Sequence, residues 1–277
     1  MPDFIAHIAN CLIVGDVFEK DGFTKLSLFL EKKNIELIQK PEILRTSKRL
    51  ENFHGKLFFS TTLIVKDVTE DELPYVQDLI YSLCFLLSFI SCSQVVFYAQ
   101  KYPKHSSLWA IVGKADIYHN LIDIRDGAIV KDFIITVWKK YRQVQKERRL
   151  DMIFDYLHNA NYSDDTVESK LVFSFITLES LKYTFALNKK ISFDKGFFRK
   201  SNDKAYGFIE LLDKMFSEVE IKFTNKKTIN SLRNEIIHSG LSQQDSSHNF
   251  KIYKEVQNLI RSYLCKLIGY NKVIRNV

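Results

Sequence analysis

A hexapeptide, RNEIIH at residues 233–238, combines two side chains that can act together on a phosphodiester. The guanidinium of Arg233 stays cationic and holds phosphate through a fork of N–H donors. The imidazole of His238 can exchange a proton near neutral pH. Asn234 precedes His238 by four residues and so shares its face of a helix, whereas Arg233 lies about 140° around the helix from His238. If the long Arg233 side chain reaches a groove shared with His238, especially one completed by a second subunit, the pair predicts cleavage of RNA.

The separation of these two residues is not specific by itself, because Arg49 and His54 are equally far apart. That second pair leads into Gly55 and an apolar, β-branched run typical of a strand, and His54 has no polar partner at helical spacing. A purely structural role for the hexapeptide also remains open. In that interpretation Arg233 pairs with Glu235 or with a carboxylate on another helix, and His238 only caps its helix.

The charge of the chain is concentrated in its C-terminal part. Of 277 residues, 46% are hydrophobic and 26% are charged, as in globular proteins, and the length suits two domains of roughly 150 residues each. Residues 1–125 carry 14 Lys and Arg against 15 Asp and Glu, net −1, and residues 126–277 carry 26 against 18, net +8. This asymmetry predicts a polyanion-binding domain beside a neutral one, although a solvated basic face without a partner gives the same numbers.

Neither a metal site nor a membrane span is expected. The four cysteines are scattered, with no CxxC pair and no His at ligand spacing, which favours free thiols in a reducing cytoplasm. The N-terminus lacks the basic region of a secretory signal. Residues 79–100 contain no charge and approach the length of a span, but the cluster SCSQ at 91–94 predicts a buried helix followed by a strand.

The N-terminal region, residues 1–125, is predicted to be a β-rich domain with one buried helix. Strands are expected at 5–14, 25–29 and 56–65, and again at 95–99 and 108–112, between clusters of Asp, Gly, Lys and Asn. Thr69 and Glu72 have the spacing of a capping box, which opens a helix that ends near Ile90.

The C-terminal region, residues 126–277, is predicted to be an α-helical bundle. Helices are expected at 128–156, 165–187, 203–219, 225–238 and 250–268, and Gly240 suits a helix C-cap after the hexapeptide. The overall prediction is therefore an α+β protein. The outer face of the first helix carries a basic run that is expected to contact an RNA backbone, with a solvated face as the alternative: Lys139, Lys140, Arg142, Lys146, Arg148 and Arg149.

Three sequence features together resemble the HEPN family (higher eukaryotes and prokaryotes nucleotide-binding), in particular its Apea-like branch. The first is the arginine–polar–x3–histidine motif that closes a late helix. The second is the stretch FSFITLESL at 173–181, which resembles the early helix of that family, and the third is LLSF at 86–89 after a β-rich leader. The likeness is firmest over residues 128–270.

The resemblance implies a metal-independent endoribonuclease without a cofactor, usually a homodimer, in antiphage defence or a toxin–antitoxin module. The family's arginine, polar residue and histidine match Arg233, Asn234 and His238, and its acidic residue matches Glu179. In this role His238 is the general acid or base, Arg233 clamps the scissile phosphate, and Asn234 orients His238 or a phosphate oxygen. The expected partners are RNA, a second copy, and an antitoxin or defence-system protein, in the cytoplasm. The alternative is a non-catalytic module that dimerises and binds RNA or a protein partner.

Overall fold

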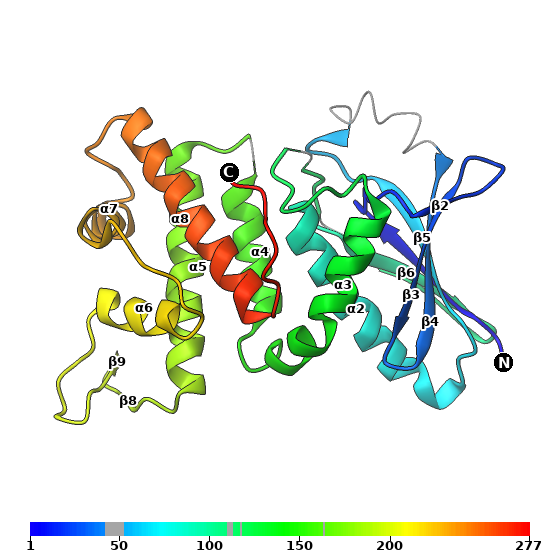
Figure 1. The fold of residues 1–277 in the computed structure, drawn as a ribbon, viewed down its shortest axis with the longest axis horizontal. Coiled ribbons are helices and arrows are strands. Elements are labelled where there is room, and N and C mark those ends of the chain that lie inside the picture. Colours follow the sequence, from blue (N-terminus) through cyan, green and yellow to red (C-terminus); the bar gives the residue numbers. More distant parts are fainter. Residues whose placement is uncertain (42–52, 110–112, 117, 163) are drawn as a thin grey trace. The chain divides into compact units, whose positions relative to one another are not determined.

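The chain has two compact units, Met1–Lys139 and Lys140–Val277. The computed structural model describes every residue except 42–52, 110–112, 117 and 163 (Figure 1). An antiparallel sheet is followed by helices, which confirms the predicted α+β class. The boundary between the units lies inside helix α3 (Gly127–Val144), whereas the sequence pattern placed it before this helix, between 125 and 126.

Among the described residues, the first unit is built on a seven-stranded sheet with the order β2-β3-β4-β5-β1-β6-β7. Every pair of neighbours is antiparallel, and β1 is paired on both sides. Residues alternate between buried and more exposed positions along β3, because one face of the sheet packs into the core and the other meets solvent. The strands are β1 (Phe4–Ala9), β2 (Val17–Phe18), β3 (Thr24–Leu30), β4 (Lys33–Gln39), β5 (Phe59–Val65), β6 (Val96–Tyr102) and β7 (His105–Leu108).

Two predictions for the sheet need correction. The strand expected at 5–14 ends at Ala9, since Asn10 has a φ of 59° and leaves the ladder. Strand β4 was not predicted, because the turn before it consists of Glu31 and Lys32, at φ of 48° and 69°, without the Gly or Asn that normally marks such a hairpin. The end of the strand expected at 108–112 and Arg49 of the second Arg–His pair lie outside the described residues.

The apolar segment of the first unit forms helix α2 (Leu73–Ser91), which is followed by β6 as predicted. The short helix η2 (Glu70–Glu72) precedes it, and the Glu72 carboxylate accepts a hydrogen bond from the backbone N–H of Thr69 at 2.9 Å, as the capping box predicts. Residues Glu70–Ser91 are long and apolar enough to cross a membrane, and within the described residues only this helix qualifies. Since α2 packs against β6 and buries much of its surface, it serves as a core helix, which is consistent with a soluble protein.

The second unit is a helical bundle around α5 (Val167–Asn188). This helix packs against α4 (Leu150–Asn161), α6 (Phe208–Ser217), α7 (Lys226–Ser239) and α8 (Ser246–Leu267), as Figure 1 shows. Leu171, Phe175, Leu178 and Phe185 of α5 are buried, as their spacing predicts. A short hairpin that was not predicted, β8 (Phe193–Asp194) and β9 (Phe197–Phe198), lies between α5 and α6 in the chain.

The single helix expected at 128–156 is two helices, α3 and α4. The chain turns between them, where Arg149 adopts a φ of 48° and the N–H of Leu150 donates to the carbonyl of Gln145 at 3.0 Å. The turn contains no Gly or Pro, and the apolar spacing continues on both sides of it. The sequence pattern therefore carried no signal for the break.

Candidate functional site

The hexapeptide forms the last two turns of α7. Ile229, Leu232 and Ile236 are buried at helical spacing, which fixes the inward face of α7 and turns the polar residues away from the core. Helix α7 ends at Ser239, and its C-cap is Gly240, whose φ of 72° suits glycine and whose N–H donates to the carbonyl of Ile236 at 2.9 Å. The predicted glycine C-cap is confirmed, and it sets the position of the final helical turn.

Arg233 is held by contacts from three helices. Its Nη2 lies 2.5 Å from Oε1 of Glu179 on α5, and its Nη1 donates to Oδ1 of Asn234 at 2.8 Å. Its guanidinium carbon lies 5.0 Å from the centre of the Phe208 ring on α6. The structure thus brings together three of the four residues assigned to catalysis, Arg233, Asn234 and Glu179. It also gives Arg233 the pairing with a carboxylate of another helix that a structural role would require.

Two further residues belong to this cluster and were not selected from the sequence. Lys182 forms an ion pair with the second oxygen of Glu179, and its Nζ lies 5.0 Å from the centre of the Phe208 ring. The Glu179 carboxylate therefore lies between two cations, and both cations also contact one aromatic ring. The spacing of Glu179 and Lys182, three residues apart on one helix, was a usable signal for their pairing, whereas nothing in the sequence indicated Phe208.

His238 stands apart from this cluster within one chain. Its side chain is exposed, and among the described residues no hydrogen bond, ion pair or ring contact joins it to Arg233 or Asn234. A single chain therefore does not bring Arg233 and His238 together in the groove that was expected to hold both. Both Asn234 and His238 are exposed, as their shared helix face predicts.

The basic run selected for RNA binding does not form one face. Lys139, Lys140, Lys146 and Arg149 are exposed, whereas Arg142 is half-buried and donates to Oε1 of Gln145 at 3.3 Å. Arg148 is only 2% exposed, so its assignment to an RNA-binding face is wrong. The reason is the turn between α3 and α4, which directs Arg148 inward and Arg149 outward.

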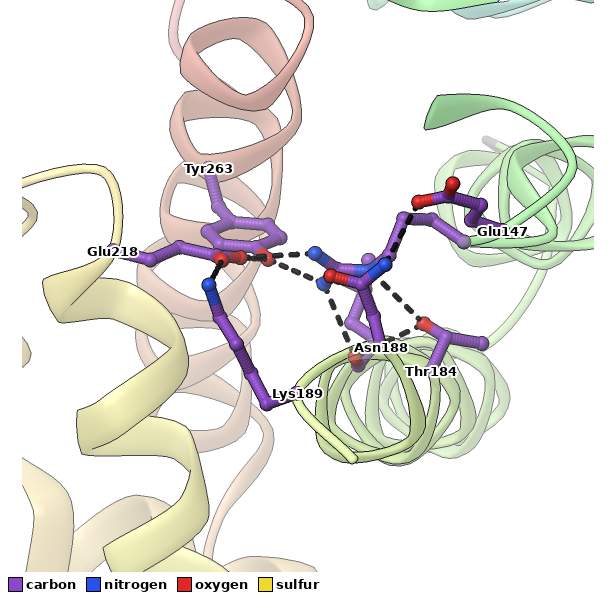
Figure 2. Close-up of polar contacts among 8 residues, drawn as sticks. Glu147, Thr184, Asn188, Lys189, Glu218 and Tyr263 are labelled. Carbon is purple, nitrogen blue, oxygen red and sulfur yellow. Dashed lines mark hydrogen bonds and ion pairs between the residues drawn. The ribbon is translucent and has the colours of Figure 1, made fainter. Parts of the chain in front are cut away.

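Arg148 instead belongs to a buried polar network with Glu218 and Tyr263, both labelled in Figure 2. Its Nη1 lies 2.9 Å from Oε1 of Glu218, and its Nη2 donates to the hydroxyl of Tyr263 at 2.5 Å. The Tyr263 hydroxyl also donates to Glu218, and Lys189 approaches the other oxygen of Glu218 at 3.4 Å. Burial raises the pKa of the Tyr263 hydroxyl well above its usual value, so the phenol stays protonated and remains a donor.

Metal ligation has no obvious location in the part of the chain that the structure describes, because no group of three or more His, Cys, Asp or Glu side chains there is arranged to hold an ion. Comparison of the chain with protein-family models, with curated proteins and with solved structures finds no match. The residues themselves, and their geometry, are therefore the basis for a proposal about function.

Proposed function

We propose that this protein is a metal-independent endoribonuclease whose site is built on α7. The observation that carries the proposal is the state of Arg233. This arginine is positioned by Glu179 and Phe208 and remains 20% exposed, on the same helix end as the exposed His238. A cation held in place beside solvent is ready to bind a phosphate without a large loss of side-chain entropy.

The proposed chemistry uses the nucleophile that RNA itself supplies. A general base removes the proton of a ribose 2′-OH, whose oxygen attacks the adjacent phosphorus, and a general acid protonates the departing 5′-oxygen. His238 takes one of these two roles, and Arg233 stabilises the charge that develops on the phosphorane. Asn234 orients His238 or a phosphate oxygen. The products are a 2′,3′-cyclic phosphate and a 5′-hydroxyl.

A second copy of the chain completes the site in this proposal. Arg233 and His238 do not meet within one chain, so a dimer that apposes two α7 ends would place the His238 of one copy near the Arg233 of the other. The arrangement proposed is HEPN-like, and two features support it: α7 ends in the motif, and α5 supplies Glu179 to its arginine. A cytoplasmic role in antiphage defence or in a toxin system, with an antitoxin or defence partner, belongs to the same proposal.

The test is cleavage of structured and single-stranded RNA in the presence of EDTA. Wild-type protein should release fragments with 2′,3′-cyclic phosphate ends, identified by mass spectrometry, and Arg233→Ala and His238→Ala should each lose at least about 100-fold in rate. His105→Ala and Lys227→Ala, two exposed residues outside the hexapeptide, are the matched controls and should cleave normally. Undiminished cleavage by both site variants would remove α7 as the site.

A non-catalytic role is the second candidate, and one observation favours it. Arg233 is already bound by Glu179 and Asn234, and His238 takes no part in that cluster. A module that only dimerises and binds RNA or a protein would not need His238 to lie beside Arg233. Wild-type protein that binds RNA without cleaving it, with binding unaffected by His238→Ala, would establish the second role over the first.

A further inference from the structure

A cavity of about 480 Å³ opens in the helical unit between α4, α5, α6 and the β8–β9 hairpin. Its volume lies in the range of ligand-binding pockets. Six aromatic side chains line it: Tyr156, Tyr183, Phe193, Phe197, Phe198 and Tyr206. The cavity is therefore lined largely by flat rings rather than by aliphatic side chains.

The rings at the hairpin form a connected group that stays open to solvent. Phe198 is buried and anchors the group, with ring centres 5.4 Å from Tyr183 and 4.9 Å from Phe193. In contrast, Tyr183, Phe193 and Phe197 are 42%, 48% and 57% exposed. Exposed rings gathered around a cavity are typical of a surface that a ligand covers.

Cations exceed anions on the wall of the cavity. Arg149 and Lys182 line it, and the lone carboxylate among its lining residues, Glu179, is already paired with Lys182 and Arg233. Aromatic rings combined with an excess of positive charge fit an aromatic ligand that carries negative charge. A nucleotide has both properties, since its base stacks on rings and its phosphate attracts cations.

The cavity also adjoins the site proposed for catalysis. Glu179 and Lys182 lie on its wall, and Glu179 is bonded to Arg233. An RNA strand whose phosphate binds Arg233 would therefore have a neighbouring base within reach of the rings. A paired base in a duplex could not enter, because its faces are covered by stacking.

We infer that this cavity is a nucleobase subsite and that the substrate is single-stranded RNA. Tyr183 and Phe197 supply the stacking faces, and Arg149 and Lys182 contact the phosphates beside the bound base. The inference rests on the proposed endoribonuclease function, to which it adds the class of substrate.

The test is equilibrium binding of a labelled single-stranded RNA to the 277-residue chain. Phe197→Ala and Tyr183→Ala should each weaken binding by about 5- to 150-fold, as expected for loss of one stacked base. The control is Phe29→Ala, which removes a ring that is 65% exposed on β3, and it should bind like wild type. Circular dichroism and thermal melting verify that each variant is folded.

Two further probes separate stacking from charge. An abasic strand with the same phosphates should bind wild type and Phe197→Ala equally, and a duplex of the same sequence should bind more weakly than the single strand. Three results for Phe197→Ala would each overturn the inference. The first is that this variant loses as much affinity for the abasic strand as for the normal single strand, and the second is that its binding of the normal single strand is unchanged. The third is that the substitution converts a dimer to a monomer. The last result would mean that a second copy covers the rings.

Failure of the inference can be distinguished from failure of the proposed function. Cleavage that depends on Arg233 and His238 but not on Phe197 leaves the endoribonuclease intact and removes the subsite. Ring-dependent binding of single strands without cleavage by wild type retains the subsite and removes the catalytic role. A wild-type protein that binds no RNA overturns the subsite directly.

Discussion

Oε1 of Glu179 lies 2.5 Å from Nη2 of Arg233, and this ion pair joins the central helix α5 to the helix that carries the hexapeptide. The other oxygen of Glu179 is paired with Lys182. One carboxylate thus restrains two cations that would otherwise be free to turn toward different partners. In the proposed enzyme, Glu179 contributes to the reaction by positioning Arg233.

Glu179→Gln tests this positioning role, because it keeps the shape of the side chain and removes its charge. The side chains of Glu179 and Arg233 are 30% and 20% exposed, so losing the ion pair should lower the free energy of unfolding by less than about 1 kcal/mol. RNA binding should tighten at low salt, since Arg233 and Lys182 lose their counter-charge. The turnover rate should fall by roughly ten-fold, while the Michaelis constant falls or stays constant, because Arg233 is no longer held. Wild-type turnover by this variant would refute the positioning role.

Arg148 and Arg149 offer a matched pair of neighbours with opposite surroundings. Arg148→Ala should lower the free energy of unfolding by about 3–5 kcal/mol, because it removes the buried cation that binds both the Glu218 carboxylate and the Tyr263 hydroxyl and leaves only the more exposed Lys189 beside Glu218. Arg149→Ala should change it by no more than about 0.5 kcal/mol. Denaturant unfolding measures both values. Equal stabilities for the two variants would contradict the buried network.

Much of the fold was accessible from sequence because apolar spacing reports which face of an element is buried. The spacing of Leu171, Phe175 and Leu178 predicted the inward face of α5, and Gly240 predicted the end of α7. The pattern failed where non-glycine residues adopt positive φ, at Lys32 before β4 and at Arg149 before α4. Such turns are set by tertiary packing, which a local pattern does not contain.

The candidate site was only partly predictable, for a related reason. The resemblance to a known family selected Glu179, and the structure places it against Arg233. Phe208 could not be selected, because a single aromatic at the start of a helix looks like any core residue until its neighbours are known. Arg148 was misassigned because periodicity extended one helix through a turn, and a residue in such a turn can point inward or outward.

The ionised carboxylate of Glu72 is expected to stabilise the folded protein at neutral pH and to lose this effect in acid. Lys33, at 2.7 Å, and the backbone N–H of Thr69 lower the pKa of Glu72 from 4.5 to about 2. A carboxylate whose pKa is lower in the folded state stabilises that state at any pH above its pKa in the unfolded chain. This stabilisation disappears as the pH falls from 4.5 to about 2. The melting temperature of Glu72→Gln should therefore lie below that of wild type at pH 7 and converge with it near pH 2.

Asp71→Asn is the control for that experiment, because Asp71 lies in the same turn and forms no hydrogen bond or ion pair among the described residues. Its melting temperature should follow that of wild type across the same range of pH. A difference between Glu72→Gln and wild type that stays constant down to pH 2 would show that the ionised carboxylate is not the source of the stabilisation.

Gly240 sets the position of the last turn of α7, and its replacement tests whether that turn matters for His238. A Cβ at Gly240 would meet no atom within 4 Å, so the cost of Gly240→Ala comes from its φ of 72° and should be about 1–2 kcal/mol in the free energy of unfolding. Gly240→Asn should cost less, since Asn tolerates this conformation. If His238 acts from this turn, cleavage should fall in the order wild type, Asn variant, Ala variant, measured well below each melting temperature. Full activity in a destabilised Gly240→Ala protein would show that cleavage does not depend on the position of the last turn of α7.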